Sequence, residues 1–211
     1  MKNTITLFLL SFLIFSCGNE SKPVVEEVST AENCEYSVDA QNIKFTWTAF
    51  KTTAKVGVNG SFDQIKISND SKSSEIPSLV LNTTFEIMLG SINSGNPERD
   101  SKLVDKFFAK LANIETFTGA IQECTGDNSE GKAIILLNAN NVEHSVLMNY
   151  SVKEDTLSLS GTLDLLDWKA EDALTSINQA CLDLHKGEDG VSKTWSDMEI
   201  KVLVPLKKVC Q

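Results

Sequence analysis

The sequence predicts an all-β fold, an antiparallel eight-stranded β-barrel with two short helices. Apolar and polar residues alternate along most of the chain after residue 34, which is typical of strands with one buried face. About eight such segments follow one another with gaps of hairpin length. A long series of one-sided strands must curl or stack to cover its apolar face and its edges. A barrel of eight strands is the simplest solution.

Five segments show the alternation directly. In the first of them, Ile43, Phe45 and Trp47 alternate with Lys44 and Thr46. The five segments span residues 43–49, 79–87, 144–150, 157–165 and 200–206. Three further strand candidates complete the series, at residues 57–67, 116–123 and 132–139.

Two segments are predicted to be helical, because their apolar residues recur at helical spacing. The first covers residues 101–111 and has Asp100 in position to cap it. The second covers residues 170–185. Arg99 and Asp100 permit two interpretations. We favour a structural pair, in which Asp100 caps the helix and Arg99 braces the loop before it, over a polar clamp on a ligand.

The chain begins with an uncharged, largely apolar run at residues 5–15. This run is about half the length that crosses a membrane as a helix, and it suits the apolar part of an export signal. The residues before Cys17, with Ile14 three positions and Ser16 one position ahead, resemble the lipobox of bacterial lipoproteins. The resemblance implies a signal peptide over residues 1–16 and a lipid on Cys17. The alternative is an ordinary cleaved signal peptide, with Cys17 as a bystander.

Residues 17–33 are predicted to be a lipidated cysteine and a flexible tether, because they contain few apolar residues and four glutamates. One domain, residues 34–211, then follows. A cysteine with two or more acyl chains anchors stably without a transmembrane helix. Asn19 stands where an aspartate would favour the inner membrane under the enteric sorting rule. We therefore expect a lipid-anchored protein of the bacterial cell envelope, on the outer membrane and facing the periplasm.

Four cysteines follow the tether, an even number in a chain with an export signal, which favours two disulfides. Buried free thiols are the alternative. In an even-stranded barrel the first and last strands run antiparallel, and Cys34 precedes the first strand while Cys210 follows the last. We therefore predict a Cys34–Cys210 disulfide and, by elimination, a Cys124–Cys181 disulfide.

The charge and the motifs exclude several classes of function. A net charge of −10 repels the phosphate backbone, so nucleic acid is not expected as a partner. Zinc and other transition metals need three or four converging ligands, and neither His144 nor His185 has such neighbours in the sequence. No HExxH, GxSxG or P-loop motif is present. We predict no enzymatic activity, no metal and no cofactor.

One stretch, GSINSGNPERDSKLVDKFF at residues 90–108, carries a more specific pattern. A Ser-Ile strand end, a short loop, Arg99-Asp100 and a helix that ends in Phe107-Phe108 resemble the YceI-like family of bacterial envelope proteins. The YSVD that begins at Tyr36, the GSFDQIKI in the second strand and the EIKVLVPL of the last strand agree with this family. The resemblance spans residues 36–206.

This resemblance implies a lipocalin-like antiparallel barrel with a long apolar interior, and some members hold isoprenoid chains such as quinones or polyprenyl lipids. The chain departs from the family at three places. Phe50 stands in place of one usual histidine, and Ser101 with Lys102 in place of another. NNVEHSVLMNYSV replaces a typical Gly-Val-Thr segment. These departures leave the identity of the ligand open.

Burial of an apolar chain contributes about 0.8 kcal/mol per CH₂, so such a ligand binds without charged contacts. The wall candidates lie on alternating strand faces or on the helix after Arg99. Phe107 and Phe108 either line the cavity mouth or anchor the helix to the barrel. Trp168 and Trp195 are assigned to the core rather than to a ligand platform. The predicted ligand-binding residues are Phe45, Trp47, Leu81, Phe85, Ile87, Phe107, Phe108 and Leu159.

The sequence thus predicts a lipid-anchored envelope protein that binds a hydrophobic small molecule of the isoprenoid, quinone or fatty-acyl type and stores, shields or transports it. The alternative is a non-enzymatic accessory protein, for envelope stress or protein interaction, whose barrel is filled by its own side chains.

Overall fold

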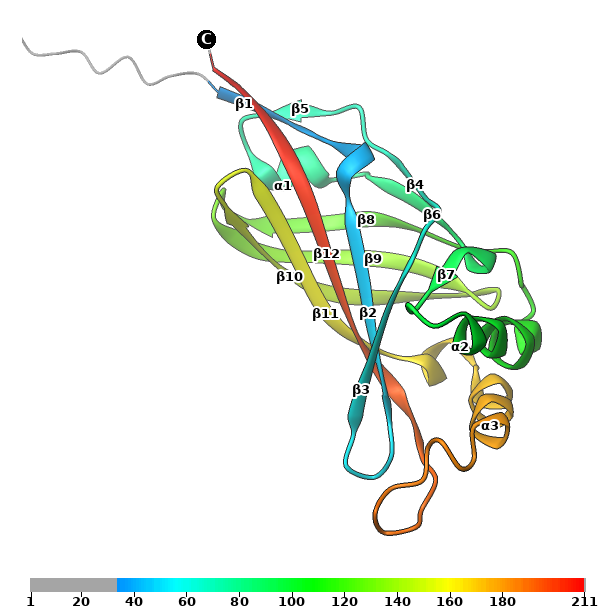
Figure 1. The fold of residues 1–211 in the computed structure, drawn as a ribbon. Helices are drawn as coiled ribbons and strands as arrows, with labels where there is room; N and C mark the ends of the chain where they lie inside the picture. Colours follow the sequence, from blue (N-terminus) through cyan, green and yellow to red (C-terminus); the bar gives the residue numbers. More distant parts are fainter. Residues whose placement is uncertain (1–33, 211) are drawn as a thin grey trace, which may run out of the picture. The chain divides into compact units, whose positions relative to one another are not determined.

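Twelve antiparallel strands form one curled sheet (Figure 1). The computed structural model describes residues 34–210. The strands are β1 (Cys34–Val38), β2 (Lys44–Lys51), β3 (Val56–Phe62), β4 (Ile65–Ser68), β5 (Lys72–Ser73), β6 (Thr84–Met88), β7 (Ile92–Asn93), β8 (Thr116–Gly126), β9 (Glu130–Ala139), β10 (Val142–Lys153), β11 (Thr156–Asp164) and β12 (Thr194–Cys210).

Ten of these strands follow one another in the order β4-β6-β8-β9-β10-β11-β12-β2-β3-β7, and β1 and β5 are added beside β12. The two ends of this path are close in the sequence. Only Asp63 and Gln64 separate β3 from β4, and a 3-10 turn, η2 (Leu89–Ser91), separates β6 from β7. Because β3 pairs with β7 while β4 pairs with β6, the sheet curls round on itself.

The predicted count of eight strands is wrong. The segment predicted at residues 57–67 is divided into β3 and β4, and β1, β5 and β7 are additional. Strands of two residues, such as β5 and β7, are too short to show an alternating pattern in the sequence.

The helices are short. They are η1 (Ala40–Asn42), α1 (Ile76–Val80), α2 (Pro97–Lys102), the π-helical turn η3 (Leu103–Phe107), η4 (Phe108–Lys110), η5 (Leu165–Trp168) and α3 (Glu171–Ala180). Figure 1 shows α2 and α3 beside each other at one end of the sheet, and α1 near β1 and β5 at the other end.

The bounds of one predicted strand and of both predicted helices differ from those in the structure. The strand predicted to begin at residue 79 starts later, because Pro77 in the first turn favours a helix there. The helix predicted to follow Asp100 begins at Pro97, and its N-cap is Asn96, whose side chain accepts a hydrogen bond from the Arg99 amide. The helix predicted over residues 170–185 ends at Ala180.

Two clusters of buried side chains hold the fold together. One joins α1 to the sheet and includes Ile76, Leu79 and Met148, all almost without solvent exposure. The other joins α3 to η3 and η4 and includes Phe107 and Ile177. The first cluster extends along the sheet as far as Trp168 of η5, and Phe117 packs against both clusters, so apolar contacts are continuous from α1 to the helical end.

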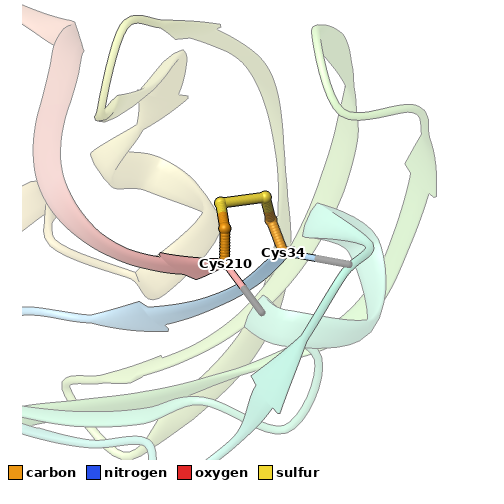
Figure 2. Close-up of a disulfide and its surroundings, with 2 residues drawn as sticks. All are labelled: Cys34 and Cys210. Atoms are coloured by element: carbon orange, nitrogen blue, oxygen red, sulfur yellow. A yellow bond between two sulfur atoms is a disulfide. The ribbon is translucent and has the colours of Figure 1, made fainter. Parts of the chain in front are cut away.

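The predicted Cys34–Cys210 disulfide is confirmed: Cys34 and Cys210 are register partners on β1 and β12 and are bonded to each other (Figure 2). The predicted Cys124–Cys181 disulfide is wrong, because both residues are free thiols. Cys124 packs against the cluster that contains α1, whereas Cys181 belongs to the cluster around α3.

The predictions for the signal peptide, for the tether and for a lipid on Cys17 lie outside the described residues. Within residues 34–210, no helix has the length and apolar character needed to cross a membrane.

Candidate functional site

An apolar cavity of about 590 Å³ lies inside the curled sheet. Ligand sites for small molecules occupy roughly 300–1,000 Å³, so this cavity has the volume of a binding site. Its wall combines residues of β2, β12 and the neighbouring strands with residues of the three α-helices. Apolar side chains predominate in this wall, and the few polar ones are considered below.

The pleat of the strands explains why these side chains face the cavity. Phe45, Trp47 and Ala49 occupy alternate positions of β2 and all line the cavity. Trp47 is opposite Ile200 of β12, and Phe45 is opposite Val202, and both of these partners line the cavity as well. The alternation seen in the sequence therefore identifies the inner face of the sheet.

Two glycines make room for aromatic side chains of the wall. Gly60 is the register partner of Trp47, and Gly119 is the register partner of Phe85. A Cβ atom at Gly60 would overlap the Trp47 ring, and one at Gly119 would overlap the Phe85 ring. Both aromatic rings therefore lie across the backbone of the neighbouring strand, and a larger residue there would displace them.

A chain of phenylalanine rings connects the sheet to the helical end. The ring of Phe62 lies 5.9 Å from that of Phe45 and 6.3 Å from that of Phe108, and Phe108 lies 6.2 Å from Phe117. Such distances are favourable for tilted and edge-to-face contacts. Phe107 also contacts Phe108, with centroids 5.5 Å apart. Both phenylalanines at the end of the sequence motif thus anchor the helix and line the cavity at the same time.

Seven of the eight predicted wall residues line the cavity: Phe45, Trp47, Phe85, Ile87, Phe107, Phe108 and Leu159. Leu81 does not line it and is 36% exposed. Leu81 follows α1 as its C-cap, so the strand alternation that placed it on the inner face does not apply there. Contact of the other seven residues with a ligand stays a prediction.

The cavity reaches the surface beside α2 and the end of α3. The exposed residues in its lining are Asn96, Glu98 and Leu184, and all three lie at this end. We call this end the cavity mouth. At the opposite end Val80 of α1, which is 4% exposed, belongs to the wall and to the buried cluster.

Arg99 and Asp100 hold the loop at the mouth. The Arg99 side chain donates to Ser94, with Nε 2.8 Å from its hydroxyl and Nη2 2.7 Å from its carbonyl oxygen. Asp100 accepts from the Ser94 amide at 2.9 Å and from its hydroxyl. The structural interpretation of this pair therefore holds, although Asn96 rather than Asp100 is the cap.

A polar group that the sequence did not reveal lies at the same end. His185 Nδ1 is 2.7 Å from the Thr194 hydroxyl, which donates to Asn178 Oδ1 at 3.0 Å. The Lys51 amine donates to the carbonyl oxygen of Leu184 at 3.2 Å. Burial, and then the positive charge of Lys51, lower the pKa of His185. These residues come from α3, β2, β12 and the segment after α3, so only the fold brings them together.

All three tryptophans of the protein line the cavity. Each indole N–H donates to a backbone carbonyl: Trp47 to Ser61 at 3.3 Å, Trp168 to Leu137 at 3.0 Å and Trp195 to Thr52 at 2.7 Å. Their rings are thereby fixed in the wall.

No group of three or more potential metal ligands converges within residues 34–210. His144 Nε2 lies 3.5 Å from an Asp167 carboxylate oxygen, and the His144 ring contacts Trp168 edge-on. The two histidines lie on different elements, His144 on β10 and His185 after α3. The site therefore has the chemistry of an apolar binding pocket with a polar mouth.

The chain is similar to a known domain family in sequence and to known proteins in structure. The sequence profile of the YceI-like domain matches residues 36–204. A polyisoprenoid binding domain from Saccharophagus degradans has a similar structure, with 14% sequence identity, a TM-score of 0.57, and coverage of 82% of this chain and 97% of that domain. Burkholderia cenocepacia BcnA is similar at 13% identity and a TM-score of 0.57, over 81% of this chain and 99% of BcnA.

A mutant of the Campylobacter jejuni YceI protein is also similar, at 18% identity and a TM-score of 0.52, over 74% of this chain and 86% of that one. No curated protein matches the chain in sequence. At such low identities the structural likenesses show a shared fold.

Proposed function

Since the chain belongs to the YceI-like domain family, we propose that its cavity binds a long apolar or amphiphilic molecule of the isoprenoid, quinone or fatty-acyl type. The observation that carries this proposal is the cavity itself, about 590 Å³ with a largely apolar wall. The structural similarity to a polyisoprenoid binding domain supports the ligand class.

In this proposal the curled sheet works as a lipocalin-like barrel, and the ligand chain lies along its interior. Each buried CH₂ contributes about 0.8 kcal/mol, so an extended chain is held by many small contributions. The aromatic rings of Phe45, Phe62 and Phe108 supply flat apolar surfaces between the middle of the sheet and the mouth. The ligand would enter beside α2, where the lining residues are exposed.

We further propose that the protein stores, shields or transports this molecule at the bacterial cell envelope, without catalysing a reaction on it. The lipid on Cys17, expected from the sequence, would hold the protein at a membrane and the tether would let the domain reach its ligand. The expected location is the periplasmic face of the outer membrane.

Native mass spectrometry of the purified protein, followed by solvent extraction, tests the proposal. We expect an adduct that solvent removes, or uptake of an added quinone or fatty-acyl probe by the emptied protein. A protein that yields no extractable lipid and takes up neither probe would contradict ligand binding and would favour the accessory role without a ligand.

A further inference from the structure

The charged residues of the cavity lining are concentrated at its mouth, and their sign is opposite to that of the whole protein. The chain carries a net charge of −10. The charged residues that line the cavity are nevertheless Lys51, Arg99, Lys102 and a single carboxylate, Glu98. An acidic protein thus presents positive charge where its apolar cavity begins.

The single carboxylate offsets at most one of these three positive charges. Glu98 pairs with Lys102 at 2.8 Å, but its side chain is 81% exposed, and an exposed pair of this kind contributes little. Among residues 34–210, neither Lys51 nor Arg99 takes part in a salt bridge. The Lys51 amine has a backbone carbonyl as its partner, and two guanidinium nitrogens of Arg99 donate to Ser94.

The cationic residues come from two sides of the mouth. Lys102 ends α2, and the next residue, Leu103, packs into the buried cluster that contains Ile177 and Cys181 of the α3 region. Lys51 ends β2 and contacts the segment after α3 through Leu184. Both lysines therefore lie on segments that contact the α3 region, one on each side of the mouth.

A cation at the edge of an apolar cavity loses hydration when a ligand covers it, and a charge-assisted hydrogen bond to an anion offsets this cost. From this arrangement we propose that the ligand carries an anionic oxygen headgroup, a carboxylate or a phosphate, which binds at the mouth to Lys51 and Lys102 while its apolar chain lies inside. This inference rests on the proposed function and names the class of amphiphile that the same cavity takes. A neutral quinone or alcohol fills the interior but gives Lys51 no anionic partner and leaves Lys102 with only the exposed Glu98.

Matched pairs of probes test the headgroup separately from the chain. Palmitate and hexadecanol share a chain of the same length, and farnesyl phosphate and farnesol share an isoprenoid. Quenching or shift of the intrinsic tryptophan fluorescence reports binding, because all three tryptophans line the cavity. We expect at least one anionic probe to bind tighter than its neutral partner, by about tenfold for each charge-assisted hydrogen bond gained. Which anion binds tighter distinguishes a carboxylate from a phosphate.

Neutral variants identify the residues responsible. Lys51→Met and Lys102→Met should each reduce the preference for the anionic probe over its neutral partner by about tenfold. Lys44→Met on β2 and Lys106→Met on η3 are the controls, because these lysines are exposed and do not line the cavity. Thermal unfolding of each variant checks that it is folded.

Each outcome has a distinct meaning. If the wild-type protein binds anionic and neutral probes equally, or prefers the neutral ones, the headgroup inference fails while the proposed function stands. If the preference exists but Lys51→Met and Lys102→Met change it no more than the controls do, the assignment to these lysines is overturned. If the wild-type protein binds no probe of either pair, the proposed function itself fails.

Discussion

Cys34 and Cys210 are separated by 176 residues in the sequence but lie directly opposite each other on β1 and β12, where a disulfide joins them (Figure 2). The bond links the first described strand to the last one. It therefore closes nearly the whole domain into a single covalent loop.

Removal of this disulfide should destabilise the protein strongly. In the chain-entropy account a loop of this length contributes about 5 kcal/mol, because it restricts the unfolded chain. The variant with Cys34→Ser and Cys210→Ser should lose up to this amount in the free energy of unfolding, measured with urea. Reductant should destabilise the wild-type protein by the same amount and leave the double variant unaffected, since Cys124 and Cys181 are free thiols. A further loss in the double variant would point to a second disulfide.

A bulky residue on the inner face of β2 should prevent ligand binding without unfolding the protein. Ala49 lines the cavity, so Ala49→Trp adds an indole to the space that a ligand would occupy. We expect the amount of extractable lipid to fall severalfold. The control is Thr46→Trp on the exposed face of the same strand, which should retain the lipid. If Ala49→Trp retains as much lipid as Thr46→Trp, the ligand does not lie in this cavity.

Substitution of Gly119 should disturb the wall at Phe85. A Cβ atom at Gly119 would overlap the Phe85 ring and also approach the carbonyl oxygen of Leu136 to 2.7 Å. Gly119→Ala should cost about 1–3 kcal/mol of stability through overpacking. Gly90→Ala is the matched control, because nothing lies within 4 Å of a Cβ atom there. Equal unfolding free energies of the two variants would show that Phe85 does not lie across the Gly119 backbone.

Mild acid should destabilise the protein through His185. Burial and the charge of Lys51 lower its pKa from the ordinary value of 6.5, so the unfolded chain binds this proton more tightly than the folded one. The contribution of His185 to the free energy of unfolding should be fully present above pH 6.5. It should be lost as the pH falls from this value to the lower pKa of His185 in the folded protein. Urea unfolding of the wild-type protein and of His185→Gln, between about pH 7.5 and pH 5, measures the effect.

The variant His185→Gln should show a smaller decline over this interval. The carboxylates whose pKa values are lowered in the folded protein, such as Asp39 and Asp127, titrate below their ordinary value of 3.8 and so lie outside the interval. A decline of the same size in His185→Gln would assign the acid sensitivity to another group.

Substitution of Cys17 tests the lipid anchor expected from the sequence. Cys17→Ser should release the protein from the membrane fraction or leave an uncleaved precursor, because serine cannot accept the thioether-linked lipid. Cell fractionation with immunoblotting measures both outcomes. A variant that matures and fractionates with the membrane as the wild type does would show that Cys17 carries no anchor.

The inner face of the sheet was predictable from the sequence because strand alternation is a local property. Phe45 and Trp47 face the cavity as their spacing indicated, and so do Phe85 and Leu159. Leu81 continued the same pattern, but Pro77 favours a helical turn just before it, and this placed Leu81 at the surface. Periodicity alone did not separate these two cases.

Properties that depend on distant segments were harder to predict. The Cys34–Cys210 pair followed from the antiparallel order of the first and last strands, but elimination gave no geometric reason to pair Cys124 with Cys181. The approach of Lys51 to the segment after α3 joins residues 133 positions apart and has no local signal. The empty volume was also not predictable, because alternation shows which side chains face inward and not how closely they pack.

The length of β12 determines where the chain enters the folded unit relative to the cavity mouth. This strand runs from Thr194, which lines the cavity beside His185, to Cys210, which is bonded to Cys34. At about 3.3 Å per residue its ends lie roughly 50 Å apart, so residue 34 and the mouth are at opposite ends of the sheet. The chain therefore enters the folded domain at the end of the sheet opposite the mouth, so a ligand can reach the cavity without passing the residues that precede Cys34.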